Sequence, residues 1–295
     1  MPQSLAQNVT LDDVTGHRYR HIGGKRTGDL SNAKGAAIID ELKLCRALSD
    51  ERDVVSLVLG DSYHPGGTDL TRRLARALEL RPGMRVAVLA SGPGATAFLL
   101  ACEFGVDVDG VDPADQLVAG ANAEAAELEL DDCVTFWTGD AERLPFDDAS
   151  VDVLISECAF CTFADKSTAA AEMARVLRPG GRVGISEVAL DPDPLDEELG
   201  SLAGWAACLA DARPVSAYRS LLGAAGLELT FVEAHDEALA CMIEQIDAGL
   251  AAVGVAEGPA LAGLDFELAR ERTATAARAV RDGVASYALM VAEKG

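Results

Sequence analysis

The sequence predicts an α/β fold with a doubly wound, mostly parallel sheet of seven strands and helices on both faces. Short apolar runs alternate with helical stretches from about residue 68 to the end of the chain. Strands that alternate with helices pair in parallel, because each helix returns the chain to the same end of the sheet. Ligands of such sheets bind beyond the carboxyl ends of the strands, so we expect the functional residues there.

The N-terminal part precedes this alternation. Residues 1–33 are polar and rich in glycine, which predicts a poorly ordered extension. Apolar residues at helical spacing begin after Lys34, so a helical segment is expected from there and a single domain over residues 34–295. After a turn at residues 63–67, leucines at helical spacing predict a helix over 68–80, which the following Arg-Pro-Gly sequence ends.

The remaining elements follow from the same periodicity. Residues 80–83 and 177–180 share the sequence Leu-Arg-Pro-Gly, a helix-to-strand turn used twice. Residues 236–282 are expected to form a helical insertion before the last strand, which is long for a connection and would either cap the substrate side or pad the sheet. Strands are expected at 85–90, 106–112, 133–137, 151–157, 182–188, 227–233 and 284–292, and helices from 95 and at 114–127, 166–177 and 215–225.

Charge and composition exclude several classes of partner. The formal net charge of −23 repels the phosphate backbone of nucleic acids and anionic membrane surfaces. No apolar run reaches the roughly 18 residues that span a bilayer, and the first residues lack the pattern of a signal peptide. Seven cysteines, an odd number, favour reduced thiols. We expect a cytoplasmic protein with a small-molecule substrate and no nucleic-acid or membrane partner, and leave its oligomeric state open.

A glycine-rich loop follows the first strand of the sheet. Residues 90–94, with the sequence ASGPG, lie between a predicted strand and helix, where glycines permit a tight turn and close approach of a ligand. Asp112 ends the next predicted strand, where a carboxylate can accept hydrogen bonds from both hydroxyls of a ribose. The loop also fits the fingerprint of NAD-binding proteins, so these residues indicate a nucleoside cofactor without choosing it.

Four stretches between about Arg85 and Val188 carry a family resemblance. They are RVAVLASGPGATAFLLA, VDGVDPADQL, TGDAERLPFDDASVDVLIS and AAAEMARVLRPGGRVGISEV, and their order and spacing resemble those of class I S-adenosylmethionine-dependent methyltransferases of the type 11, ubiquinone and menaquinone biosynthesis branch. NAD enzymes do not use the last two stretches. The resemblance implies a Rossmann-like sheet whose last strand, in SYALMVAEKG, is antiparallel. It also implies S-adenosyl-L-methionine as cofactor and methyl transfer to a small molecule as the reaction.

The resemblance further implies which residues hold the cofactor. The loop glycines would let the backbone approach its methionine part, and the acid that ends the second strand would hold the ribose. The acid after the third strand would accept from the adenine amino group, and the sulfonium and the acceptor would meet at the end of the fourth strand. In chain order, this set consists of Ala90, Ser91, Gly92, Gly94, Asp112, Asp140, Ala141, Glu142, Ser156 and Glu157.

Val88 departs from the family pattern. The family usually has an acid at this position, four residues before the first loop glycine, where it helps to orient the loop and the cofactor's amino group. Loss of one charge-assisted hydrogen bond costs about 1.5–3 kcal/mol, or roughly ten- to a hundredfold in affinity. The chain is therefore expected to be an active methyltransferase or, as the alternative, a non-catalytic or repurposed member of the fold.

Two features bear on the acceptor. A general base is needed only if the acceptor loses a proton, and His64, beside Tyr63 in the first turn, would be that base or a structural residue. Cys158 and Cys161, with Cys241 in the insertion, would grip a soft metalloid as arsenite methyltransferases do, or simply pack in the core. No metal site is expected, because no second Cys pair or nearby His accompanies them. The aromatic content of 5% argues against a large stacked acceptor.

Overall fold

The structure is a computed structural model that describes residues 64–190, 212–253 and 266–295. The expectations for residues 1–33, for the helical segment that begins after Lys34, and for Tyr63 as a substrate contact lie outside the described residues.

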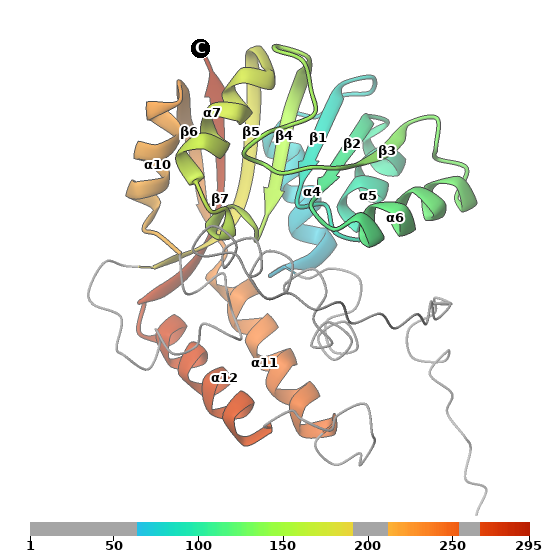
Figure 1. Cartoon of the computed structure of the whole chain (residues 1–295). Coiled ribbons are helices and arrows are strands. Elements are labelled where there is room, and N and C mark those ends of the chain that lie inside the picture. The colour runs from blue at the N-terminus through green and yellow to red at the C-terminus, as the bar shows by residue number, and fades with distance from the viewer. Residues whose placement is uncertain (1–63, 191–211, 254–265) are drawn as a thin grey trace, which may run out of the picture.

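A seven-stranded sheet forms the centre of the described part of the chain (Figure 1). Its order is β3-β2-β1-β4-β5-β7-β6, in which neighbours from β3 to β5 pair in parallel and β7 is antiparallel to both β5 and β6. This architecture confirms the predicted fold class, including the antiparallel last strand. The strands are β1 (Arg85–Leu89), β2 (Asp107–Asp112), β3 (Val134–Thr138), β4 (Val151–Glu157), β5 (Leu177–Leu190), β6 (Leu227–Ala234) and β7 (Ala285–Lys294).

Helices cover both faces of the sheet. They are α4 (Gly67–Ala77), α5 (Ala95–Phe104), α6 (Asp115–Glu127), the short 3-10 helix η1 (Phe160–Thr162), α7 (Lys166–Val176) and α10 (Val215–Ala224). Leu70, Leu100 and Val118 bury α4, α5 and α6 in one core cluster, whereas Met173 and Leu222 bury α7 and α10 in the cluster on the other face. Figure 1 accordingly shows α7 and α10 in front of the sheet.

Two elements differ from the sequence expectation. Helix α4 ends at Ala77, earlier than expected, because Glu79 adopts a left-handed conformation with φ of 56° that a helix cannot continue. Strand β5 begins at Leu177, earlier than expected, because Leu177 already pairs with Val151 before a register shift. The Leu-Arg-Pro-Gly turn is therefore absorbed into the strand, and Gly180 keeps the positive φ of 73° that the turn needs.

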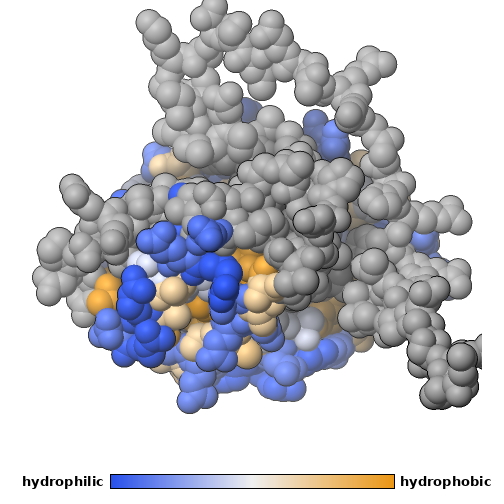
Figure 2. Space-filling model, turned by 90° about the horizontal axis from the view of Figure 1, so that it is seen from below, coloured by the Kyte–Doolittle hydropathy of each residue, from blue (hydrophilic) through white to orange (hydrophobic). Residues whose placement is uncertain are grey.

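The helical insertion lies beyond the carboxyl ends of the parallel strands. Helix α11 (Asp236–Val253) follows β6, and α12 (Phe266–Arg281) leads into β7, which starts at that edge because it is antiparallel. Figure 1 shows the two helices side by side below the sheet, and Leu239 and Ala276 join them to the main core cluster. Seen from below, the described surface is mostly hydrophilic around a few gathered apolar side chains (Figure 2). None of the helices in the described ranges is long and apolar enough to cross a membrane.

Candidate functional site

The chain reverses its direction of winding between β1 and β4. From β1 it proceeds through β2 to β3 at one edge, and then returns to β4 and winds toward the other edge. Ligands of α/β sheets bind beyond the carboxyl ends of the strands at such a switch point, because the loops on the two sides diverge there. The glycine loop follows β1 and Glu157 ends β4, so the topology brings both to the switch point.

Left-handed residues bend the loop after β1. The φ angles are 52° at Ala90, 55° at Gly92 and 99° at Gly94. Ala90 is exposed, and a Cβ at Gly92 would have no atom of the described residues within 4 Å. A Cβ at Gly94 would instead lie 2.6 Å from Cζ of Phe136, so packing requires glycine there. Space for a ligand therefore exists beside the first part of the loop, whereas Gly94 fits the loop to the sheet.

Asp112 connects this loop to the start of α6. Its Oδ2 accepts a hydrogen bond from the Gly92 N–H at 2.9 Å, and its Oδ1 accepts one from the Ala114 N–H, also at 2.9 Å. The residue is only 5% exposed. An ionised carboxylate has about four acceptor positions, so roughly two stay open after the bonds that the described residues make. The carboxylate can therefore hold the loop and accept from a ligand at the same time.

The expected adenine contacts lie in the loop after β3. Asp140 forms an isolated bridge with Arg143, and its Oδ1 accepts from the Glu142 N–H at 3.1 Å. Ala141 between them is buried. The Glu142 carboxylate accepts from the Asp165 N–H at 2.8 Å, which ties this loop to the start of α7. The structure thus brings the predicted residues into one tight turn whose side chains are already oriented.

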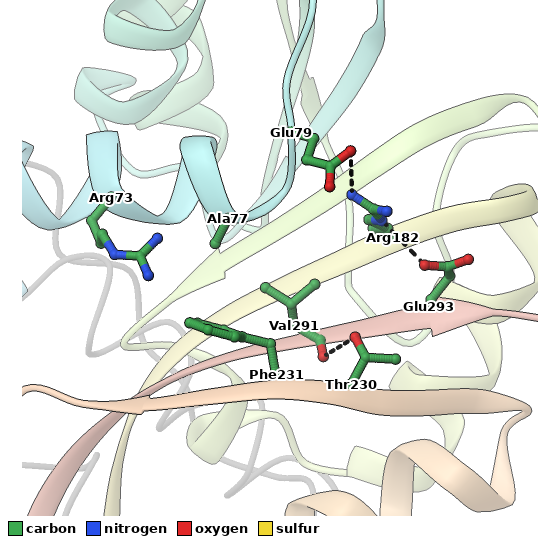
Figure 3. A pocket seen from close by; sticks show the side chains of 8 residues that line it. All are labelled: Arg73, Ala77, Glu79, Arg182, Thr230, Phe231, Val291 and Glu293. Carbon is green, nitrogen blue, oxygen red and sulfur yellow. Dashed lines mark hydrogen bonds and ion pairs between the residues drawn. The ribbon is translucent and has the colours of Figure 1, made fainter.

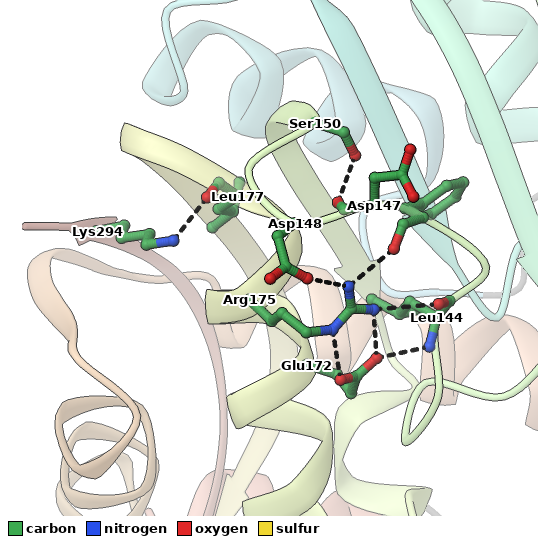
Figure 4. A network of polar contacts seen from close by, with 9 residues as sticks. Leu144, Asp147, Asp148, Ser150, Glu172, Arg175, Leu177 and Lys294 are labelled. Atoms are coloured by element: carbon green, nitrogen blue, oxygen red, sulfur yellow. Dashed lines mark hydrogen bonds and ion pairs between the residues drawn. The ribbon is translucent and has the colours of Figure 1, made fainter.

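A polar network on α7 clamps the same loop (Figure 4). The Arg175 guanidinium donates to the carbonyl oxygens of Phe146 at 2.8 Å and Leu144 at 3.2 Å, and Glu172 accepts from the Leu144 N–H at 2.9 Å. The hydrogen bonds from Arg175 hold the pKa of Glu172 below its usual value. Because these bonds engage the main chain, they set the path of the loop rather than of one side chain.

Strand β4 ends in two polar side chains. Ser156 is fully buried, and its hydroxyl has no hydrogen-bond partner among the described residues. The Glu157 side chain is 5% exposed and accepts from the hydroxyls of Thr96 at 2.6 Å and Thr71 at 3.1 Å. His64 Nε2 lies 3.5 Å from the same carboxylate and 3.3 Å from Thr71 Oγ1. The candidate base His64 and the β4 terminus therefore share one buried cluster.

A second polar pair stands beside Glu157 on β5 and β7. Ser186 pairs with Glu157 across the strands, and its Oγ accepts from the Tyr287 hydroxyl at 3.1 Å. Burial raises the pKa of Tyr287 well above its usual value, and nearby Cys158 and Glu187 act in the same direction, so the phenol stays a neutral donor. Sequence reasoning missed this pair, together with the two threonines. The sequence signal that could have revealed the pair is a polar residue inside an otherwise apolar strand, as Ser186 is in β5.

The structure does not assemble the three candidate cysteines into one site. Cys161 is fully buried in the core, Cys158 is half-buried, and Cys241 is exposed on α11. Leu239 and Ile243, which flank Cys241 at a spacing of two, are both buried, so Cys241 faces away from them. Within the described ranges, no three His, Cys, Asp or Glu side chains are placed to hold a metal ion.

A shallow groove of about 210 Å³ opens elsewhere (Figure 3). Arg73 pairs with Glu233 there, and Arg182 pairs with Glu293 at 3.2 Å. Arg182 and Glu293 lie near the amino ends of the parallel strands, opposite to the edge that carries the glycine loop. The groove is therefore separate from the candidate cofactor residues, and each of its charged side chains has a partner of opposite charge. Its lining consists of Arg73, Ala77, Glu79, Arg182, Thr230, Phe231, Val291 and Glu293.

Comparisons with known proteins agree with this geometry. Residues 88–185 match a family model described as a methyltransferase domain. The chain is 37% identical over 163 residues to arsenite methyltransferase of Halobacterium salinarum, which covers 54% of this chain and 41% of that protein. It is 34% identical over 154 residues to 27-O-demethylrifamycin SV methyltransferase of Amycolatopsis mediterranei, with 48% and 57% covered. The chain thus spans about half the length of these curated relatives.

Solved structures show the same fold. Phosphoethanolamine N-methyltransferase 2 of Haemonchus contortus, in complex with phosphomonomethylethanolamine and S-adenosylhomocysteine, superposes with a TM-score of 0.72 at 19% identity. The match covers 85% of this chain and 59% of that one. The matched residues 88–185, the sheet order and the glycine loop all agree with a methyltransferase domain of the class I, S-adenosylmethionine-dependent kind, which is what this chain is similar to.

Proposed function

We propose that this chain transfers a methyl group from S-adenosylmethionine to a small-molecule acceptor at the carboxyl edge of the sheet. The observation that carries the proposal is the Asp112 carboxylate, which the Gly92 and Ala114 N–H groups hold in place while about two of its acceptor positions stay open. A ribose offers two neighbouring hydroxyls to such a carboxylate. The cofactor supplies an already activated methyl group, so the chain mainly needs to align the reactants.

Two buried hydroxyls support a ligand at this place. Ser91 Oγ and Ser156 Oγ are buried without a hydrogen-bond partner in the described part of the chain, and they end or follow the adjacent strands β1 and β4. A buried polar group without a partner costs about 1–3 kcal/mol, which a polar ligand can offset. The open space beside Gly92 lies in the same loop. These features fit the methionine and ribose parts of the cofactor.

The surrounding elements would position the ligand and exclude water. The Arg175 and Glu172 clamp holds the loop that would lie beside the adenine, so the adenine contacts are set before binding. Helices α11 and α12 lie beyond the same edge, and we interpret this insertion as a cap over the acceptor side. A cap strengthens polar contacts in the site by removing water from it.

The acceptor would lie between the β4 terminus and this cap. His64 is the candidate base for an acceptor that must lose a proton, because it is buried beside Glu157 at the same edge. The net charge of −23 disfavours a nucleic-acid acceptor. The relatives are named for arsenite, a demethylrifamycin and phosphoethanolamine, three chemically unrelated acceptors, so likeness to them does not select one class.

Calorimetric titration tests the proposal. We expect S-adenosylmethionine and S-adenosylhomocysteine to bind and NADH not to bind. Methyl transfer is then sought with labelled cofactor and a panel of acceptors that includes small amines, alcohols and arsenite with a thiol. Binding of NADH alone would overturn the assignment.

Val88 favours a second candidate function, in which the protein binds the cofactor but does not transfer its methyl group. Val88 is 3% exposed and apolar where the family pattern has an acid. This candidate predicts that S-adenosylhomocysteine binds while no acceptor in the panel is labelled. Product formation that is lost in His64→Ala but retained in the exposed-residue control Asp132→Asn would favour the active enzyme.

A further inference from the structure

Glu157 is a buried acid with no permanent positive charge beside it among the described residues. Its side chain is 5% exposed, and its described partners are two hydroxyls and His64, which carries a charge only when protonated. No Lys or Arg of the described residues contacts this carboxylate. Hydroxyl donors satisfy its hydrogen bonding but do not supply the countercharge that a buried anion favours. The site therefore suits a ligand that brings a cation.

The position of Glu157 relates it to the residue that departs from the family pattern. Val88 pairs with Ile155 across β1 and β4, and both belong to the same core cluster. Side chains alternate between the faces of a strand, so Glu157 is the next side chain on that face after Ile155. Leu89 pairs with Ser156, which places Glu157 beside Ala90 of the glycine loop. Glu157 thus places an acid on the same face of the sheet as position 88, two residues further along the strands and nearer to the loop.

The hydroxyls that hold Glu157 come from the elements that frame the loop. Thr96 lies in the first turn of α5, directly after the glycines, and donates at 2.6 Å. Thr71 lies on α4, is 1% exposed, and donates at 3.1 Å. The carboxylate is therefore tied to α5 and α4 as well as to its own strand. This arrangement aims it at the loop and limits its rotation, which keeps it ready for a charged partner.

We propose that Glu157 receives the α-amino group of the cofactor, so that the acid missing at position 88 is replaced by one from β4. S-Adenosylmethionine carries an ammonium on its methionine part, and the inference rests on the proposed function that this cofactor binds here. The carboxylate and ammonium form a charge-assisted hydrogen bond in a place from which water is largely excluded. Glu157 is then a binding residue that makes the contact with the amino group that Val88 cannot make.

A cycle of two proteins and two ligands tests this role. The ligands are S-adenosylhomocysteine and its analogue that lacks only the α-amino group, and their dissociation constants are measured by calorimetry. Wild type should prefer S-adenosylhomocysteine, whereas Glu157→Gln should bind it about 10- to 100-fold more weakly and bind the analogue within about twofold of wild type. The control Asp132→Asn, at an exposed acid that accepts no side-chain hydrogen bond in the described structure, should leave both affinities unchanged.

The outcomes separate the inference from the function on which it rests. An equal loss for both ligands would show that Glu157 acts through the fold, and no loss for either would place the amino group elsewhere; both results overturn the inference. If wild type does not bind S-adenosylhomocysteine, the proposed function itself fails. Should Glu157→Gln not fold, Glu157→Asp keeps the charge but withdraws it by one methylene. It should again lose affinity for S-adenosylhomocysteine alone.

Discussion

Substitution of Asp112 by asparagine probes the centre of the candidate site with almost no change of shape. The carboxylate accepts one backbone N–H on each oxygen, from Gly92 and from Ala114, both at 2.9 Å. The amide of asparagine has a single acceptor oxygen, and its NH₂ group would face the other N–H. Asp112→Asn therefore leaves one buried N–H without an acceptor and removes the charge from the remaining bond.

The expected magnitude follows from these two losses. A hydrogen bond to a charged group contributes about 1.5–3 kcal/mol, and an unsatisfied buried donor costs about 1–3 kcal/mol. We expect the free energy of unfolding to fall by about 2–3 kcal/mol, since the loop can relax in part. The affinity for S-adenosylhomocysteine should fall at least about tenfold, because each 1.4 kcal/mol corresponds to a factor of ten.

Urea denaturation and calorimetric titration measure the two effects. Asp132→Asn serves as the matched control, because Asp132 is an exposed acid that accepts no side-chain hydrogen bond in the described structure. It should change the free energy of unfolding by less than about 0.5 kcal/mol and leave the affinity unchanged. A folded Asp112→Asn protein with wild-type affinity would refute the assignment of this carboxylate to the cofactor.

Three further predictions concern stability. Gly94→Ala should cost more than Gly180→Ala by about 1–3 kcal/mol in urea denaturation, because both positions have positive φ but only the first Cβ would collide, with Phe136; equal costs would contradict the packing argument. The pKa of Glu172 is lowered in the fold, so its contribution is present at neutral pH and is lost as the pH falls below about 4.3 and through the folded pKa. The difference in unfolding free energy between wild type and Glu172→Gln should therefore shrink between pH 6 and pH 3, and a constant difference would reject this linkage. Val88→Asp should lower the free energy of unfolding by about 3 kcal/mol, because it buries an acid at a 3% exposed position. It should not raise the affinity for S-adenosylhomocysteine, and a higher affinity would show that the loop still accommodates the family's acid.

The sequence by itself determined the helices and strands, and it determined the site residues that end a strand or directly follow one. Strand β4 covers the predicted residues Val151–Glu157 because an apolar run ended by polar residues specifies both its period and its limits. The glycine loop and Asp112 were predictable for the same reason, since each directly follows or ends a strand. Local turn chemistry was less decisive at Leu177, where pairing with Val151 extended β5 through a predicted turn.

Only the tertiary structure decided which distant residues share a contact. Glu157 meets Thr96 across a separation of 61 residues and Thr71 across 86, and no local pattern encodes those distances. Strand order and helix packing set them, because they bury apolar surface from the whole chain at once. The same packing left Cys241 on the outer side of α11, so cysteines that look equivalent in the sequence do not converge. Periodicity follows from short-range geometry, whereas the neighbours of a side chain depend on how the complete core is filled.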